Sequence, residues 1–329
     1  MAKGGAMRSL SGVSGAVAVA LALTCVQGCS KVGELKAKKT FKAANQAYQS
    51  QDFKKATDLY EETIAAAPDI RQADQSYFFL ANSYDQQFKP SRKGEADNDA
   101  LMTKAAANYK IAAEKLSARS EPEDKQLGKR ALEYLVAAYG PDKLNDPAKA
   151  EPVVQRMIQI EPGETTNYFA LAKIYEDAGA YENAEQMLVK AKEAKPNDAD
   201  VYKQLAGFYN RQGQFEKTIE ALEQGAAKQP SNPEGYYTIA TYYWDEAYRD
   251  ARLKEPQKKE FVQKGIAATD HALQIKSDYA DALVYKNLLL RLAANFEKDA
   301  KKQQELIKQA DQLRDKALAI KKQKATGSD

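Results

Sequence analysis

The chain has 329 residues, enough for two ordinary domains or for one array of repeats. Its 49 basic and 46 acidic residues nearly balance at a net charge of +3, which argues against a nucleic-acid-binding protein, since such a protein needs a basic stripe. One Trp, one His and two Cys leave few groups for catalysis or metal binding. We therefore expect no nucleic-acid partner, no metal and no cofactor.

Residues 1–29 are predicted to form a lipoprotein signal peptide. Lys3 and Arg8 give it a basic start, and residues 13–26 are almost uncharged and rich in Ala, Val and Leu. This run is shorter than the roughly 20 apolar residues that a membrane-spanning helix needs. A true start at Met7 would give a more conventional signal.

The end of this segment, Val26-Gln27-Gly28-Cys29, resembles the bacterial lipobox. The resemblance implies that Cys29 is lipidated and becomes the mature N-terminus, which would tether the protein to a membrane. Ser30 resembles the outer-membrane sorting pattern, so the expected location is the outer membrane, facing the periplasm. Attachment to the inner membrane, an uncleaved anchor and simple secretion are the alternatives. No cysteine follows Cys29, so no disulfide is expected in the exported body.

Residues 30–39 are predicted to be a short basic tether, and a helical array is expected over residues 40–322. Its first repeat is expected near 40–70. The first helix of this repeat matches the repeat pattern poorly, as is expected for an end repeat whose outer face is exposed to solvent. The remaining residues, 323–329, are expected to be a disordered tail.

The second repeat, near 74–118, begins with Tyr77-x2-Leu80-Ala81-x2-Tyr84 and is then interrupted. Pro, Gly and charged residues predict a loop over 88–94, and residues 96–102 are expected to lengthen the second helix backwards. A third repeat is expected near 129–164.

The most regular part of the chain follows, as two repeats near 165–198 and 199–232. Tyr168-x2-Leu171-Ala172-x2-Tyr175 has the i, i+3, i+4, i+7 spacing of one apolar helix face, and the same string returns 34 residues later from Tyr202. Ala172 and Ala184 are small enough for two helices to cross closely, with Tyr175 and Tyr181 expected beside the crossing. The pattern predicts a stack of similar helical hairpins.

These residues resemble the tetratricopeptide repeat (TPR) family, with Tyr in place of the leading Trp and Ala in place of the glycine after Leu171. The matching positions are Tyr168, Leu171, Ala172, Tyr175, Gly179, Tyr181, Ala184, Ala191 and Pro196. The resemblance implies an all-α fold, a right-handed α-solenoid of about six to seven antiparallel helix pairs. Repeats near 233–279 and 280–322 complete it, the first interrupted around Lys254-Glu255-Pro256 and the second ending in a Lys-rich capping helix.

In the TPR family the first helices of the repeats line a concave groove that binds peptides. The residues that contact the peptide lie one or two positions away from the packing stripe. Carried over to this sequence, the candidate groove residues are Asn45, Tyr48, Phe78, Asn82, Asp85, Phe169, Lys173, Asp177, Lys203, Asn210, Tyr237, Thr241 and Trp244. Phe78, Phe169, Tyr237 and Trp244 would place large aromatic groups in the groove, where such groups are common binding anchors. The insertions near 85–104 and 244–264 could either cover this groove or extend it.

Together, the resemblances to the TPR family and to the lipobox imply a membrane-anchored scaffold that binds a protein or peptide partner in cell-envelope assembly or secretion. A small-molecule or glycan-binding lipoprotein, with Tyr237 and Trp244 as a stacking platform, is the alternative. We expect no catalytic residue, since the single histidine, His271, is expected to be packed or solvent-facing. The sequence does not specify the oligomeric state.

Overall fold

The computed structural model describes the backbone of residues 1 and 14–325, and the side chains of residues 1 and 31–325. Over this backbone the regular structure consists of fourteen α-helices and one short 3-10 helix, with no strand. The predicted all-helical fold of consecutive hairpins is confirmed. The chain divides into two compact units, Met1–Ile160 and Glu161–Asp329.

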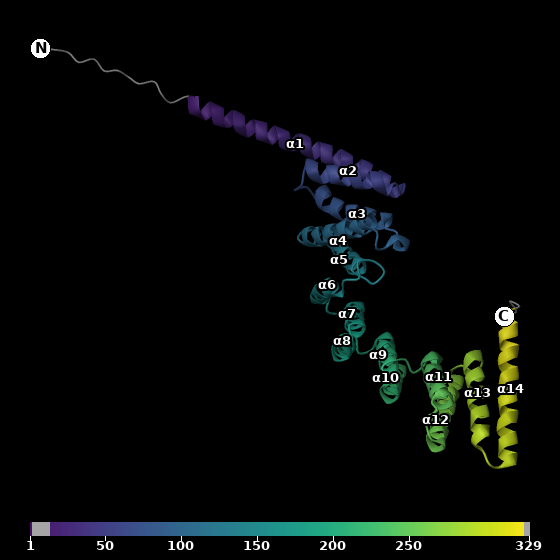
Figure 1. Cartoon of the computed structure of the whole chain (residues 1–329). Coiled ribbons are helices and arrows are strands. Elements are labelled where there is room, and N and C mark those ends of the chain that lie inside the picture. Colours follow the sequence, from purple (N-terminus) through teal and green to yellow (C-terminus); the bar gives the residue numbers. More distant parts are fainter. Residues whose placement is uncertain (2–13, 326–329) are drawn as a thin grey trace. The chain divides into compact units, whose positions relative to one another are not determined.

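The first unit contains three helical hairpins, α1/α2, α3/α4 and α5/α6, whose members pack against each other (Figure 1). The first helices also touch in sequence, since α1 contacts α3 and α3 contacts α5. The elements are α1 (Ser14–Gln49), α2 (Phe53–Ala66), α3 (Arg71–Gln87), η1 (Pro90–Arg92), α4 (Ala96–Ser117), α5 (Pro122–Ala138) and α6 (Pro147–Ile160).

The second unit contains four hairpins, α7/α8, α9/α10, α11/α12 and α13/α14, and α11 also contacts α13. Its elements are α7 (Thr165–Asp177), α8 (Tyr181–Ala194), α9 (Ala199–Arg211), α10 (Phe215–Lys228), α11 (Pro233–Arg249), α12 (Glu255–Ile275), α13 (Ala280–Phe296) and α14 (Ala300–Ala325).

Local sequence signals set the helix ends. Asp198 and Asn232 cap α9 and α11, each accepting a hydrogen bond at 3.0 Å from the backbone N–H two residues later. Gly179 and Gly213, in the tight turns of two hairpins, have φ of 74° and 67°, values that glycine adopts without steric cost.

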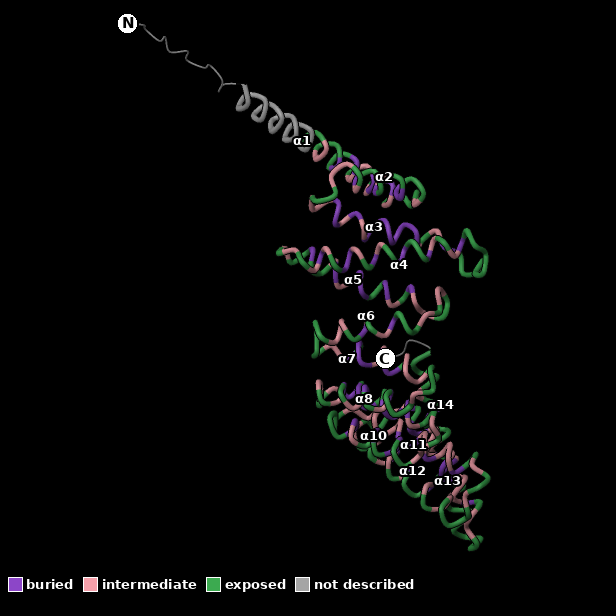
Figure 2. The backbone as a smooth tube through the Cα atoms, turned by 60° about the vertical axis from the view of Figure 1, so that its left-hand side comes forward, coloured by how far each residue is buried: buried purple, intermediate pink, exposed green. Residues whose placement is uncertain are grey.

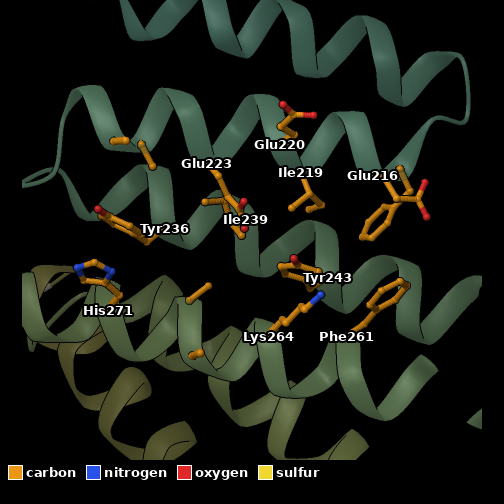
Figure 3. Close-up of a pocket in the computed structure, with 15 residues that line it drawn as sticks. Glu216, Ile219, Glu220, Glu223, Tyr236, Ile239, Tyr243, Phe261, Lys264 and His271 are labelled. Carbon is orange, nitrogen blue, oxygen red and sulfur yellow. The ribbon is translucent and has the colours of Figure 1, made fainter. Parts of the chain in front are cut away.

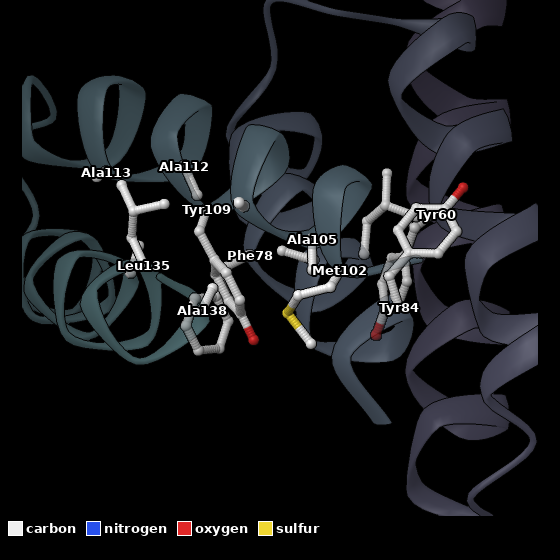
Figure 4. Close-up of a cluster of buried hydrophobic side chains, with 14 of the residues drawn as sticks. Tyr60, Phe78, Tyr84, Met102, Ala105, Tyr109, Ala112, Ala113, Leu135 and Ala138 are labelled. Carbon is white, nitrogen blue, oxygen red and sulfur yellow. The ribbon is translucent and has the colours of Figure 1, made fainter. Parts of the chain in front are cut away.

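Small residues allow the helices to approach each other, and large ones fill the space between them. In the first unit Tyr60 of α2 and Met102 and Tyr109 of α4 are fully buried in one cluster that also contains several alanines (Figure 4). The crossing predicted for α7 and α8 is also present, since Ala172 and Ala184 are both buried. Buried residues follow the helix faces that meet neighbouring helices, and exposed residues follow the outer faces (Figure 2).

Tyr181 departs from the expectation that it fills space beside this crossing. It is the first residue of α8, and its side chain is 49% exposed. Side chains on a helix lean toward the helix N-terminus, which carries Tyr181 past the end of the contact with α7. Tyr175, the other tyrosine expected beside the crossing, is half-buried.

Two boundaries also differ from the prediction. The segment predicted as a tether, 30–39, is helical within α1, and Ala37 in it is fully buried. Its Lys, Ala, Glu and Leu residues favour a helix over an extended tether. The first helix of the third repeat begins at Pro122, earlier than predicted, because proline suits the first helical position.

Both insertions lengthen helices. Residues 96–102 extend α4 backwards, as expected from the sequence, and residues 88–94 form the loop that contains η1. The second insertion lengthens α11 to Arg249 and starts α12 at Glu255. Among residues 31–325, whose side chains are described, none of the helices is both long and apolar enough to cross a membrane.

Candidate partner-binding groove

In the first unit, three of the predicted groove positions belong to an internal hydrogen-bond chain. Tyr48 donates its hydroxyl to Asn82 Oδ1 at 2.6 Å, and Asn82 Nδ2 donates to the Tyr109 hydroxyl at 3.1 Å. The Tyr109 hydroxyl lies 3.4 Å from Asp85 Oδ2, and Lys143 Nζ donates to both Asp85 oxygens at 2.6 and 2.7 Å. Asn82 is 3% exposed, so these groups tie α1, α3 and α4 together and do not project from them.

The other two candidates in this unit are also engaged. Asn45 accepts a hydrogen bond from the Tyr60 hydroxyl at 2.7 Å. Phe78 is 6% exposed and packs edge-on against Tyr109 and Tyr134 (Figure 4). Phe78 is therefore a core residue in this structure.

The adjacent residue, Phe79, lies on the first-helix face instead. It lines a hollow of about 380 Å³ formed by α1, α3 and α5, together with Phe41 and Arg130. Asn45 also borders this hollow, as the sequence predicts for a groove residue. The aromatic residue displayed by α3 is thus one position later than predicted.

In the second unit, the polar candidates lie at the surface of α7 and α9. Lys173 is exposed and forms an ion pair with Asp177, and Lys203 is exposed and lies 3.4 Å from Asp200. Asn210 is exposed, and Phe169 is half-buried. These side chains are accessible to a partner, with the two lysines held by acidic neighbours on their own helices.

An aromatic strip runs along α11 and onto α13. Its members are Tyr237, Trp244 and Tyr248 on α11, Tyr285 on α13 and Tyr279 at the N-cap of α13. The Trp244 and Tyr248 rings are nearly parallel, at 10° and 5.0 Å between centroids. Tyr285 meets Trp244 edge-on at 5.8 Å and Tyr237 edge-on at 5.4 Å, and Tyr279 lies 5.3 Å from Tyr237.

This aromatic strip is partly open to solvent. Tyr248 is 62% exposed, and the other four members are half-buried. Burial, together with the neighbouring Tyr285, raises the pKa of Tyr237, so its hydroxyl stays protonated and available as a hydrogen-bond donor. The strip therefore offers apolar ring faces with phenol hydroxyls beside them.

Of the aromatic strip, the sequence predicts Tyr237 and Trp244 and misses the other three. Tyr248 could have been found, because it continues the spacing of Tyr237, Thr241 and Trp244 by one more turn of α11. The insertion near 244–264 predicts a break in the helix there, whereas α11 continues to Arg249. Tyr285 comes from the least regular predicted repeat, so no motif placed it in register.

Metal-binding clusters are absent from the part of the chain whose side chains are described. No group of three or more His, Cys, Asp or Glu residues there could hold a metal ion. His271 is exposed, and its ring lies against Tyr236, with 3.8 Å between centroids. Cys29, the predicted lipidation site, lies outside the residues with described side chains.

A family model described as tetratricopeptide repeat matches residues 143–207. The chain contains tetratricopeptide repeats. The match covers α6 to α9 and includes Tyr168, Leu171 and Ala172, the residues on which the resemblance rests. Repeats of this kind generally serve as scaffolds without catalysis. A comparison with curated proteins finds no match.

One solved structure supports the same fold for the hairpins on either side of that match. The C-terminal part of a TPR repeat-containing protein from Cytophaga hutchinsonii is similar at 17% identity and a TM-score of 0.51, covering 85% of this chain and 98% of that one. A tetratricopeptide repeat protein from Parabacteroides merdae covers 84% of this chain and 99% of its own, at 13% identity and a TM-score of 0.44. At these identities the similarity concerns the fold alone.

Proposed function

We propose that this tetratricopeptide repeat protein is a membrane-anchored scaffold that binds a segment of a protein partner along the aromatic strip of α11 and α13. The observation that carries the proposal is the exposure of Tyr248 beside Trp244, since solubility alone would favour polar residues there. Aromatic side chains with a polar tip are the commonest energetic anchors of protein interfaces.

The charged residues of the first helices in this unit favour a peptide over a carboxylate-terminated or strongly charged ligand. Lys173 and Lys203 are already paired with Asp177 and Asp200, and Arg249 is paired with Asp245 at 2.8 Å. These lysines therefore do not form a free basic clamp for a terminal carboxylate. Apolar and aromatic side chains of a partner are the groups that the strip is best suited to bind.

Anchoring at the outer membrane is the second part of the proposal, and it rests on the sequence Val26-Gln27-Gly28-Cys29. Lipid attached at Cys29 would hold the array close to the periplasmic surface, where it would serve envelope assembly or secretion. Labelling cells with a radioactive fatty acid should label the wild-type protein and leave Cys29→Ala unlabelled. A labelled Cys29→Ala protein, or an unlabelled wild type, would refute the anchor independently of the groove.

Affinity capture tests the binding proposal. The purified wild-type protein should retain a small set of proteins from envelope extract, and Trp244→Ala with Tyr285→Ala should lose them. Tyr181→Ala is the matched control, because Tyr181 is an exposed tyrosine of the same unit that lies outside the strip. Capture of the same set of proteins by the wild type, the double variant and Tyr181→Ala would contradict the proposal.

The nearly parallel Trp244 and Tyr248 rings also suit the flat face of a sugar, which keeps the glycan-binding alternative. Binding to immobilised glycans that depends on Trp244, with no protein captured from extract, would favour that alternative. We propose no catalytic activity for either case.

A further inference from the structure

A second groove in the same unit lies between α10 and α12, with α11 as its floor (Figure 3). Its volume is about 640 Å³. It uses Tyr236, Ile239 and Tyr243 of α11, none of which belongs to the aromatic strip. The two surfaces can therefore be occupied separately.

One end of this groove is aromatic. The ring centroids of Phe215 and Phe261 lie 5.0 Å apart, and each lies 5.8 Å from that of Tyr243. Phe215 and Phe261 are half-buried, so part of each ring faces the groove. Such a cluster is suited to receive one large apolar side chain.

Small residues line the rest of the groove together with Ile219 and Ile239, and the far end carries the stacked Tyr236 and His271. Ala267 and Ala268 stand on α12, and Ala226 and Ala227 stand on α10 toward the far end. Small side chains are what let helix axes approach to about 8–10 Å. On α12 the ten residues from Phe261 to His271 correspond to about 15 Å, or about three helical turns.

The α10 wall is acidic. Glu216, Glu220 and Glu223 follow one another at i, i+4 and i+7, so they lie along one side of α10, above the groove (Figure 3). All three are exposed, and none forms an ion pair within residues 31–325. Like charges at these spacings destabilise a helix slightly, and a cationic ligand would relieve them.

The opposite wall neutralises this row only in part. Lys264 is the lysine that lines the groove on α12; it lies 2.8 Å from Glu260 of its own helix and also interacts electrostatically with Glu223. The groove thus combines an apolar floor with an acidic edge whose charge exceeds that of the facing lysine.

We propose that this groove binds an amphipathic helix of a partner, about three turns long, with Lys or Arg along one edge and apolar residues on the face that enters the groove. The small alanine side chains on both walls favour a helix over an extended segment. The acidic row fixes which way the basic edge of the helix faces. The binding site goes beyond the aromatic strip and does not depend on it.

Fluorescence anisotropy with a synthetic helix tests this inference. The probe is a labelled peptide of roughly 15 residues built from Leu, Ala and Lys, with Lys spaced at i, i+4 and i+7. Wild-type protein should bind it, more weakly at high salt, because exposed charges are screened. A protein with Glu216→Gln, Glu220→Gln and Glu223→Gln should bind about tenfold more weakly.

Matched variants locate the site. Glu182→Gln with Glu193→Gln removes acidic groups from the equivalent helix α8 and should leave binding unchanged. Ala267→Trp, at an exposed position in the middle of the groove, should abolish binding by filling it while the melting temperature is kept. Trp244→Ala should have no effect, which separates this result from failure of the proposed function.

Three outcomes would overturn the inference. The first is equal binding of a peptide with Glu in place of each Lys. The second is unchanged binding by both the triple Gln variant and Ala267→Trp. The third is a concentration-dependent mass increase of the free protein that Ala267→Trp abolishes, which would make a second copy of this chain the occupant.

Discussion

The Tyr48 hydroxyl of α1 donates to Asn82 Oδ1 of α3 at 2.6 Å, and the amide of Asn82 donates onward to Tyr109 of α4. One asparagine thus bonds two neighbouring hairpins within the core of the first unit. Buried polar groups of this kind are costly to leave unpaired, and here both ends of the amide are engaged.

Removing Asn82 should therefore destabilise the first unit. We expect Asn82→Ala to lower the free energy of unfolding by about 1–3 kcal/mol, because both tyrosine hydroxyls lose a buried partner. Chemical denaturation measures the change. Tyr48→Phe should cost less, about 1 kcal/mol, and the double variant should cost less than the sum of the two. If the changes in unfolding free energy of the two single variants simply added, the Tyr48–Asn82 hydrogen bond would contribute no coupling energy.

Acid should weaken the first unit through Asp124. Burial raises the pKa of this carboxyl, but hydrogen bonds from Arg71 and Gln75 outweigh it and hold the pKa below its ordinary value of 3.8. Because the folded pKa is lowered, the stabilisation is present above the ordinary value and is lost as pH falls through the folded value. Melting temperatures from pH 6 down to 2 should fall more steeply for the wild type than for Asp124→Asn. Parallel curves would contradict this assignment.

Two helix-interior glycines should respond oppositely to alanine. A Cβ at Gly225 would lie 2.9 Å from the Tyr202 Cβ, whereas one at Gly207 would meet only the flexible end of Arg211, at 3.3 Å. Alanine favours a helix over glycine by about 1 kcal/mol, so Gly207→Ala should be neutral or stabilising. Gly225→Ala should cost about 1–3 kcal/mol by overpacking. Thermal melting of the pair checks this, and a stabilising Gly225→Ala would refute the close approach.

The single tryptophan of the chain reports on the aromatic strip. Trp244 is half-buried between Tyr248 and Tyr285, so removing either ring should expose more indole to water. Tyr248→Ala and Tyr285→Ala should each shift the emission maximum to longer wavelength. Tyr181→Ala should leave it unchanged. An unshifted spectrum in both strip variants would mean that the rings do not cover Trp244.

Residue spacing predicts the helical hairpins well, because one repeat reproduces the packing stripe of the next. Ala172 and Ala184 follow directly from that repetition. The displayed residues are harder to predict, since the register at Phe78 and Phe79 depends on Tyr109 of α4 and Tyr134 of α5, far along the chain. The charge of residues 30–39 predicts a tether, whereas the buried face at Ala37 makes this segment part of α1.

The acidic groove is also hard to predict from the sequence, because it depends on contacts between residues far apart in the chain. Glu216, Glu220 and Glu223 are ordinary solvated charges when α10 is considered alone. They form the edge of a groove only because α12 places Phe261 and two alanines opposite them.

Site-specific photo-crosslinking in living cells tests the central claim most directly. A benzophenone amino acid in place of Tyr248 should form a covalent adduct with a defined set of protein partners, and Trp244→Ala in the same chain should remove it. The same group in place of Tyr181 should give no such adduct. Equal crosslinking from both positions, or none from position 248, would contradict a partner bound along the aromatic strip.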